Sequence, residues 1–492
     1  MSLDAMLLLG AVVLIAAVAA ARIGSRLGLP SLLIFLGLGL SLELFGLRMT
    51  DAALAHALGF AALVFILAEG GFSTKWVDIK GSLSIAGLLA TVGVLISIAL
   101  VAVFCHLVLK LPVAQAALIG AITAPTDSAA IFSVLRGMPL PARVRSVLEG
   151  ESGLNDAPIV LLVAAATAWT LGDVPGGPLS LGLTIAFELA GGVVLGAIIG
   201  FAGGWLLRSV ALPASGLYPL AALSVAVLAY GLGVWLHLSG FAAVYVAALI
   251  LGNSKLPHRN ATRSFAEGIG WIAQIGLFVM LGMLASPEGL TLQMVGESLI
   301  IGAFLTFVAR PLSVVVCAIW FKVPWREQAF ISWAGLRGAV PIIMATVPLA
   351  AGAPSAARIS EEVLVLVVVF TLLQAPTLPW VARRLGIAGE VDPTDIEVEV
   401  APLDRIQADF MQVSVPEGSR LHGVTIRELR LPKFTVISVI LRDGEPIVPQ
   451  PGDRLCERDE LMVVVPSARR AEVEERFRSI GRSGRLARWL HP

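Results

Sequence analysis

Apolar residues gather in long runs across residues 1–385 of this 492-residue chain, and short polar stretches separate the runs. A helix needs about 20 predominantly apolar residues to cross a bilayer. Most of the runs approach or exceed that length, and only 240–252 falls well below it. The pattern predicts an α-helical polytopic membrane protein. The thirteen predicted spans are 4–22, 30–47, 54–72, 83–108, 113–135, 144–170, 181–207, 214–237, 240–252, 264–285, 293–320, 327–350 and 361–382.

The pattern changes after the membrane domain, which we place at 1–385. Residues 386–402 are rich in carboxylates, which predicts a solvated acidic linker. From 403 to 466 apolar and polar residues alternate in short segments divided by turn signals such as Asp443-Gly444, as is typical of strands. A basic helix over 467–492, either solvated or lying on the membrane surface, completes a small α/β domain. The predicted strands are Met411–Val415, Phe434–Arg442, Glu445–Val448 and Leu461–Val465.

Basic residues gather in alternate loops of the membrane domain, although the formal net charge of the chain is zero. Loops rich in lysine and arginine remain on the cytoplasmic side. The N-terminus is therefore expected outside and the C-terminal domain inside, which agrees with an odd number of spans. The basic loops contain Arg22, Arg26, Lys75, Lys80, Arg136, Arg143, Arg145, Arg208, Lys255, Arg259, Arg263, Lys322, Arg326, Arg383 and Arg384, whereas the opposite loops contain Arg48, Lys110 and Arg358.

Two predicted spans contain sequences that interrupt a helix. The fifth contains Thr123-Ala124-Pro125-Thr126-Asp127, and the twelfth contains Gly335-Leu336-Arg337-Gly338-Ala339-Val340-Pro341. Proline removes a backbone donor and clashes with the preceding turn. Interruptions at corresponding places in two halves indicate a transporter built from inverted repeats. The repeats would be spans 1–6 and 8–13, and the binding site would lie between them. Ordinary proline kinks in membrane helices are the alternative.

The sixth predicted span contains four polar residues near its centre, Glu151, Ser152, Asn155 and Asp156. An ionised carboxylate at the centre of a membrane helix costs about 2.5–3.5 kcal/mol on insertion scales, so such groups are usually functional. Residues four apart share a helix face, which places the Ser152 hydroxyl beside Asp156. Asp156 is therefore expected to accept either a proton or a cation.

Further oxygen atoms are available from other spans. Asp127 and the carbonyl groups freed near Thr126 at the fifth-span break are candidates to complete a cation site, because an alkali cation needs several hard oxygen ligands. Glu69, near the cytoplasmic end of the third span, is expected to be a further ligand or an entry group, with a snorkelling interfacial carboxylate as the alternative.

Two arginines also lie within spans. Arg310 needs a buried partner, and Glu151, one turn from the site, is the expected one. Arg337 lies at the twelfth-span break, where it is expected to offset the ends of the half-helices and the charge of Asp127. Both arginines are interpreted as charge-compensating and structural, and a mobile gating charge is the alternative.

Four short motifs in the membrane domain resemble, in combination, the signatures of the monovalent cation:proton antiporter-1 family. They are Thr126-Asp127, Glu151-Ser152-Gly153-Leu154-Asn155-Asp156, Ala309-Arg310-Pro311 and Gly335-Leu336-Arg337-Gly338-Ala339-Val340-Pro341. The stretch from Ser133-Val134-Leu135 through Leu148, with Phe330-Ile331-Ser332-Trp333, resembles the cell-volume-regulation-type (NhaP-like) potassium/proton branch. Residues 403–466, with Val415-Pro416-Glu417-Gly418-Ser419 and Pro451-Gly452-Asp453, resemble the C-terminal (RCK_C or TrkA-C-like) module of proteins that regulate potassium conductance.

The resemblance implies a homodimer of thirteen-helix subunits, each with a dimer domain, a core domain, two discontinuous helices that cross, and elevator-like alternating access. It implies that Asp156 carries the exchange, while Asn155 replaces the second aspartate of electrogenic relatives, so that exchange is one-for-one and electroneutral. The implied ligands of K⁺ or Na⁺ are Asp156, Ser152, the Thr126 carbonyl and Glu69. The implied buried ion pair is Glu151 with Arg310.

These observations predict a secondary antiporter, not an enzyme, that exchanges a monovalent cation for H⁺ across the bacterial cytoplasmic membrane. K⁺ is the expected cation. A Na⁺/H⁺ antiporter of the same fold is one alternative. A ligand-gated cation channel is another, but no filter sequence such as Thr-Val-Gly-Tyr-Gly occurs. No cofactor and no nucleic-acid partner are expected. The C-terminal domain is expected to regulate transport, with a nucleotide or an ion as its ligand.

Overall fold

The computed structural model describes residues 3–27, 31–127, 140–173, 178–285, 290–387, 398–403, 408–466 and 469–483. The chain forms two compact units, Met1–Gly389 and Glu390–Pro492, and each is described here by itself. Three predictions lie partly outside the described residues. They concern the end of the fifth span with the motif Ser133-Val134-Leu135, most of the linker 386–402, and residues 484–492 of the terminal helix.

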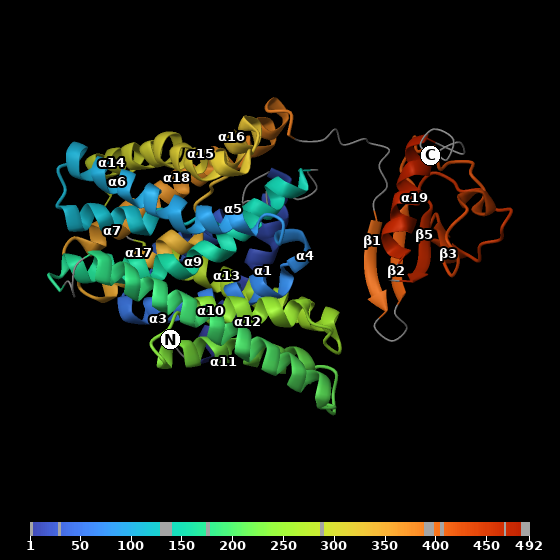
Figure 1. The fold of residues 1–492 in the computed structure, drawn as a ribbon, viewed down its shortest axis with the longest axis horizontal. Helices are drawn as coiled ribbons and strands as arrows, with labels where there is room; N and C mark the ends of the chain where they lie inside the picture. The colour runs from blue at the N-terminus through green and yellow to red at the C-terminus, as the bar shows by residue number, and fades with distance from the viewer. Residues whose placement is uncertain are drawn as a thin grey trace. The chain divides into compact units, whose positions relative to one another are not determined.

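Long apolar helices build the first unit, as the sequence predicts (Figure 1). Among the described residues, eight helical stretches are long and apolar enough to cross a membrane, and five shorter apolar helices accompany them. The elements are α1 (Leu3–Leu27), α2 (Ser31–Leu44), α3 (Ala52–Ser73), α4 (Trp76–Ile79), α5 (Leu83–Leu88), η1 (Leu89–Gly93), α6 (Val94–Val108), α7 (Val113–Thr123), α9 (Ala142–Thr170), α10 (Pro178–Ser209), α11 (Leu217–Trp235), α12 (Gly240–Asn253), α13 (Arg259–Leu284), α14 (Leu292–Phe304), η3 (Leu305–Ala309), α15 (Arg310–Ala318), η4 (Ile319–Phe321), α16 (Trp325–Trp333), α17 (Ala339–Ala350) and α18 (Ala356–Arg384).

π-turns interrupt two of the long helices. The turn η1 joins α5 to α6, and the turn η3 joins α14 to α15. A π-turn closes i→i+5 hydrogen bonds and frequently marks a functional site within a helix. The second π-turn ends directly before Arg310, which is one of the two intramembrane arginines singled out in the sequence.

A helix ends at each of the two predicted breaks. α7 ends at Thr123 and residues 124–127 are not helical. α16 ends at Trp333 and α17 begins at Ala339. Pro341 lies in the first turn of α17, where a backbone N–H has no partner within the helix, so this proline is tolerated and the break precedes it.

The two unwound segments contact each other although they are far apart in the sequence. The backbone N–H of Asp127 donates to the carbonyl oxygen of Leu336 at 2.9 Å. Neither of these two backbone groups has a partner within a helix. The bond pairs them with each other, as buried backbone groups require. The breaks of the fifth and twelfth predicted spans therefore form one joint structure.

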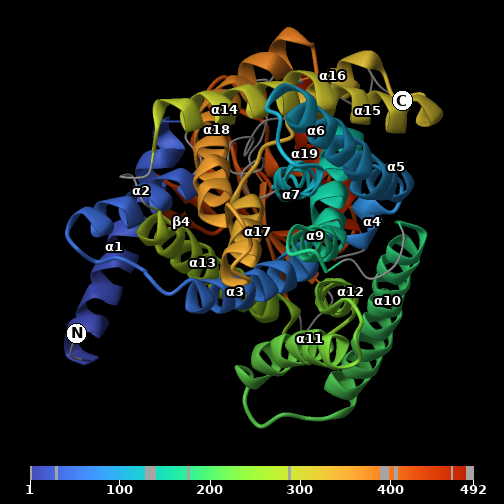
Figure 2. The ribbon, with the colours of Figure 1, turned by 90° about the vertical axis from the view of Figure 1, so that its left-hand side faces the viewer.

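The helix α9 passes through the interior of the membrane unit (Figure 2). It packs against α5, α7, α10, α12 and α17. The helix α3 packs against α12, α13 and α17, and it also contacts α9. Helices from the beginning, middle and end of the unit thus surround the polar centre of α9.

The second unit contains a five-stranded antiparallel sheet with the strand order β1-β2-β5-β3-β4. Alternate residues of its central strands, such as Met411 and Val463, face a buried core. Asp459 is fully buried and accepts two hydrogen bonds of 2.8 Å from Arg442, which raise the pKa of that guanidinium. The elements are β1 (Val398–Leu403), β2 (Ala408–Ser414), η5 (Ile426–Leu429), β3 (Val436–Arg442), β4 (Glu445–Ile447), β5 (Glu460–Pro466) and α19 (Arg470–Ser483).

Two boundaries of the predicted C-terminal organisation need correction. The predicted linker 386–402 contains most of β1, which pairs with β2 in the register Val400↔Met411. The terminal helix is not a separate solvated element, because Val473, Phe477 and Ile480 of α19 are buried in the core of the sheet unit. The sequence pattern did not predict β1 because a run of acidic residues precedes it and Glu399 lies within it. It did not predict the packing of α19 because arginines and glutamates dominate that helix.

Candidate functional site

The four polar residues of α9 are all buried. The solvent-exposed fraction of the residue is 1% for Glu151, 4% for Ser152, 0% for Asn155 and 7% for Asp156. Pro158, inside the same helix, cannot donate a backbone hydrogen bond to the carbonyl of Leu154. The sequence thus concentrates polar side chains and a freed backbone acceptor within two turns of one membrane helix.

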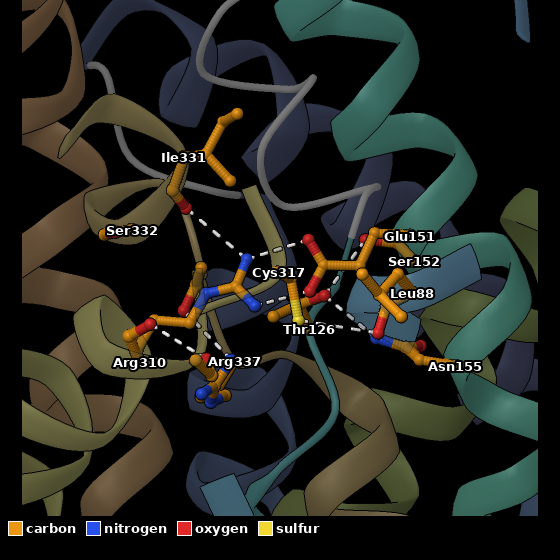
Figure 3. A network of polar contacts seen from close by, with 12 residues as sticks. Leu88, Thr126, Glu151, Ser152, Asn155, Arg310, Cys317, Ile331, Ser332 and Arg337 are labelled. Carbon is orange, nitrogen blue, oxygen red and sulfur yellow. Dashed lines mark hydrogen bonds and ion pairs between the residues drawn. The ribbon is translucent and has the colours of Figure 1, made fainter. Parts of the chain in front are cut away.

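Thr126, from the unwound segment after α7, connects to α9 through its hydroxyl group (Figure 3). The Asn155 amide nitrogen donates to Thr126 Oγ1 at 3.0 Å, and Ser152 Oγ lies 3.3 Å from the same oxygen. These bonds fix Ser152 and Asn155 against the fifth-span break. The structure therefore brings together three of the predicted site residues.

Asp156 lies against a cavity of about 80 Å³. One of its carboxylate oxygens, Oδ1, is buried and accepts no hydrogen bond from the described residues, and the same holds for Oδ1 of Asn155. A buried polar atom without a partner is costly, and such atoms call for a functional explanation. The predicted site residues that line the cavity are Glu69, Thr126, Asp127, Ser152 and Asp156.

Glu69 reaches this cavity from α3. Its carboxylate accepts a hydrogen bond of 2.8 Å from the Ser73 hydroxyl one turn later. A Cβ atom at Gly270 of α13 would lie 2.8 Å from Cγ of Glu69, so only glycine leaves room for the glutamate stem. Glu69 is therefore held in the wall of the cavity and does not extend along the surface.

Asp127 has two roles in the geometry of the site. It lines the cavity, and its Oδ2 atom accepts the backbone N–H of Ala339 at 3.2 Å. Ala339 is the first residue of α17, so the carboxylate lies at a helix N-terminus, where the unpaired N–H groups and the helix dipole favour negative charge. Asp127 thereby links the fifth-span break to the second half of the twelfth span.

Glu151 and Arg310 form a buried ion pair on a different side of α9 (Figure 3). The two guanidinium nitrogens of Arg310 donate to the two carboxylate oxygens at 2.5 and 2.8 Å, and Nη2 also reaches the carbonyl of Ile331 at 3.4 Å. Bidentate geometry is the strong form of this pair. Neither residue lines the cavity beside Asp156, so the pair is separate from the cavity oxygens.

Arg337 is buried, and its guanidinium donates to the carbonyl of Gly335 at 3.2 Å. Its own carbonyl accepts the Thr371 hydroxyl of α18 at 2.7 Å. Within the part of the chain that the structure describes, no carboxylate forms an ion pair with Arg337. Contacts with backbone and with the Thr371 hydroxyl therefore hold Arg337 at the break.

Sequence reasoning missed two residues that line the cavity, Tyr245 of α12 and Gln274 of α13. Tyr245 is 5% exposed, and its hydroxyl oxygen would lie 2.5 Å from a Cβ atom at Gly153 of α9. An uncharged polar residue inside an apolar span is the signal that could have identified Gln274. Tyrosine gives no such signal, because it is common at membrane interfaces and in cores.

Two family models match the chain. Residues 12–384 match the transmembrane part of the sodium/hydrogen exchanger, and residues 410–478 match the TrkA-C domain. The second match extends beyond the predicted module 403–466 into α19, in agreement with the packing of that helix.

Curated relatives extend over both units. The K(+)/H(+) antiporter NhaP2 of Shewanella oneidensis is 34% identical over 473 residues, which cover 92% of this chain and 81% of the relative. The K(+)/H(+) antiporter NhaP of Alkalimonas amylolytica is 32% identical, with 94% and 81% covered. The Na(+)/H(+) antiporter NhaH of Halobacillus aidingensis is 28% identical, with 61% and 76% covered.

A solved structure shares the fold. The sodium proton antiporter MjNhaP1 from Methanocaldococcus jannaschii at pH 8 matches with a TM-score of 0.66 and 23% identity, and the match covers 78% of this chain and 99% of that one. At this identity the likeness concerns the fold alone.

Proposed function

Because the chain belongs to the sodium/hydrogen exchanger family, we propose that it exchanges K⁺ for H⁺ across the bacterial cytoplasmic membrane. The predicted family is confirmed, and the chain is a multi-pass membrane transporter, not an enzyme. The observation that carries the proposal is the buried carboxylate of Asp156, whose Oδ1 atom has no partner among the described residues and which lies against a cavity with further oxygen atoms.

The proposed mechanism depends on competition for Asp156. The carboxylate holds either a proton or the cation, with the Ser152 hydroxyl, the Thr126 carbonyl and Glu69 as further cation ligands. A protein that changes conformation only when this site is loaded exchanges one substrate for the other. Since Asn155 cannot carry a charge, one proton is exchanged for one monovalent cation and transport is electroneutral.

The remaining charged residues of the site are proposed to hold the two breaks in place. Glu151 and Arg310 neutralise each other beside the site and so allow Arg310 to remain buried. Asp127 stabilises the start of α17, and Arg337 contributes positive charge to the twelfth-span break. None of these three contacts requires a change of protonation during transport.

The finer architecture follows from the same proposal. We propose thirteen spans in two inverted repeats, with discontinuous helices that cross where Asp127 meets Leu336, and the N-terminus outside. We propose a homodimer in the lipid bilayer, and a cytoplasmic TrkA-C domain that regulates transport by binding a nucleotide or an ion. Deleting residues 400–492 is expected to change the pH profile of transport, and an unchanged profile would reject this role.

Potassium is proposed before sodium because the relatives that cover both units at 32–34% identity are named K(+)/H(+) antiporters. Sodium remains the second candidate, since NhaH, at lower identity, is named a Na(+)/H(+) antiporter. Both ions take oxygen ligands, so cation selectivity has to be measured. A channel is distinguished by conduction without a proton gradient.

The decisive experiment measures cation-driven proton movement in everted vesicles with K⁺, Na⁺ and Li⁺ over a range of pH. Wild-type protein is expected to respond to K⁺, whereas Asp156→Asn abolishes the response to every cation. Asp173→Asn, at an exposed carboxylate beyond the end of α9, is the matched control and should transport normally. Full activity of Asp156→Asn would reject the mechanism, and a larger response to Na⁺ than to K⁺ would reject only the choice of cation.

A further inference from the structure

A groove with an apolar lining lies between α15 and α16, outside the transport site. Its volume is about 330 Å³, and the two helices lie at the edge of the membrane unit (Figure 2). Several side chains that line it are exposed although they are large and apolar, including Phe307 at 57% and Trp325 at 68%. In a membrane-spanning unit, such a surface faces lipid.

The polar side chains in the groove are largely engaged by the protein itself. Gln328 donates to the carbonyl of Val323 at 2.7 Å, and the indole N–H of Trp333 donates to the Thr377 hydroxyl at 3.0 Å. Ser332 donates to the carbonyl of Gln328 at 2.7 Å. A ligand in this groove therefore meets mainly apolar atoms, which suits a hydrocarbon chain better than a polar solute.

Positive charge lies at one end of the groove. Lys322 and Arg326 are exposed on either side of Trp325, and the Arg326 guanidinium lies 5.8 Å from the centroid of the Trp325 ring. Among the described residues, no ion pair involves Lys322 or Arg326. A Cβ atom at Gly386 would lie 3.4 Å from Nη1 of Arg326, so the basic end of α18 is also close.

We propose that this groove binds one anionic phospholipid, with an acyl chain against Phe307 and Trp333 and the headgroup beside Lys322 and Arg326. Aromatic residues next to lysine and arginine mark the level of the lipid headgroups. Basic pockets between membrane helices bind anionic headgroups, and neutral headgroups lack the charge to do so. The site is independent of the cation site, and the proposal does not depend on the transported ion.

The charge of the groove favours lipid over a second copy of the chain. Two subunits inserted in the same orientation would place their basic ends at the same depth of the membrane, so an isologous contact through this groove would bring like charges together. An anionic lipid neutralises that charge.

Native mass spectrometry of the full-length protein tests the proposal, with palmitoyl-oleoyl phosphatidylglycerol and palmitoyl-oleoyl phosphatidylcholine as probes. Wild-type protein should retain one phosphatidylglycerol per chain in preference to phosphatidylcholine. Lys322→Gln/Arg326→Gln should weaken that retention by roughly ten- to thirtyfold. Ala329→Trp, which fills the groove, should reduce retention of both lipids.

The matched control is Arg208→Gln/Lys255→Gln, which removes two exposed basic residues, one on α10 and one in the connection between α12 and α13, and should retain phosphatidylglycerol like wild type. Size-exclusion chromatography and circular dichroism establish that each variant is folded. Equal retention by the Lys322/Arg326 and control variants would overturn the proposal. A change in the monomer-to-dimer ratio without a change in lipid retention would identify the groove as a subunit interface and would overturn it as well.

Discussion

The carboxylate of Asp127 occupies the space in which a side chain on Gly338 would begin. A Cβ atom built on Gly338 would lie 1.6 Å from Oδ2 of Asp127, far inside van der Waals contact. The same oxygen accepts the backbone N–H of Ala339. The unwound segment of the twelfth span thus contains glycine at this position because the carboxylate from the fifth span must reach the start of α17.

Gly338→Ala is therefore expected to displace Asp127 and to disturb the joint between the two breaks. Overpacking of this kind costs about 1–3 kcal/mol of the free energy of unfolding. The variant should melt at a lower temperature and lose most cation-driven proton exchange in proteoliposomes. Gly276→Ala is the control, since nothing lies within 4 Å of a Cβ atom there, and its melting temperature should not fall. Wild-type behaviour of Gly338→Ala would contradict the contact.

Glu151→Gln should destabilise the protein because it leaves Arg310 buried without a counter-charge. Removing one partner of a buried ion pair typically costs about 3–5 kcal/mol, whereas replacing both partners with apolar residues is often neutral. The expected result is a low melting temperature for the single variant and substantial recovery for Glu151→Leu/Arg310→Met. An unchanged melting temperature for Glu151→Gln would show that the pair does not stabilise the fold.

The contact between Glu151 and Arg310 also illustrates what the sequence could predict. The two residues are 159 positions apart, yet a buried arginine requires a carboxylate and the polar centre of α9 offered one. The apolar runs predicted the helices, and the prolines indicated the breaks. In each case the sequence alone shows the cause: apolar length for a helix, proline for a break, and a buried charge for an ion pair.

Packing contacts between helices that involve no ion pair could not be predicted in the same way. Helical periodicity identifies the face of a residue but not the neighbouring helix, so the position of Tyr245 against Gly153 remained hidden. The same limit applies to the place of Glu69 in the cavity wall, which depends on Gly270. In the C-terminal unit, β1 was not predicted because it follows a run of acidic residues and itself contains Glu399 and Pro402, which an edge strand tolerates.

Gly153→Ala tests the packing of α12 on the polar centre of α9. The added methyl carbon would lie 2.5 Å from the hydroxyl oxygen and 2.8 Å from Cζ of Tyr245, and Ser152 is the adjacent residue. Thermal stability and the apparent affinity for the cation should both fall. The second change in Gly153→Ala/Tyr245→Leu makes room and should restore the melting temperature. Gly231→Ala, where a Cβ atom meets nothing within 4 Å, is the control. If the double variant does not recover stability, the contact with Tyr245 is not the cause of the destabilisation.

The uncharged residue Asn155 directly precedes Asp156, and this sequence predicts that membrane potential does not drive transport. The Asn155 amide nitrogen donates to Thr126 Oγ1. An uncharged side chain therefore occupies the position next to Asp156, the carboxylate proposed to carry the exchange. One proton then replaces one monovalent cation, and no net charge crosses the membrane. In proteoliposomes with fixed K⁺ and pH gradients, valinomycin is added or omitted, so that the membrane potential changes while the chemical gradients stay constant. The initial rate of K⁺-driven proton movement should be the same in both cases. A rate that changes with potential at constant chemical gradients would show unequal exchange, and a second titrating group would then be required.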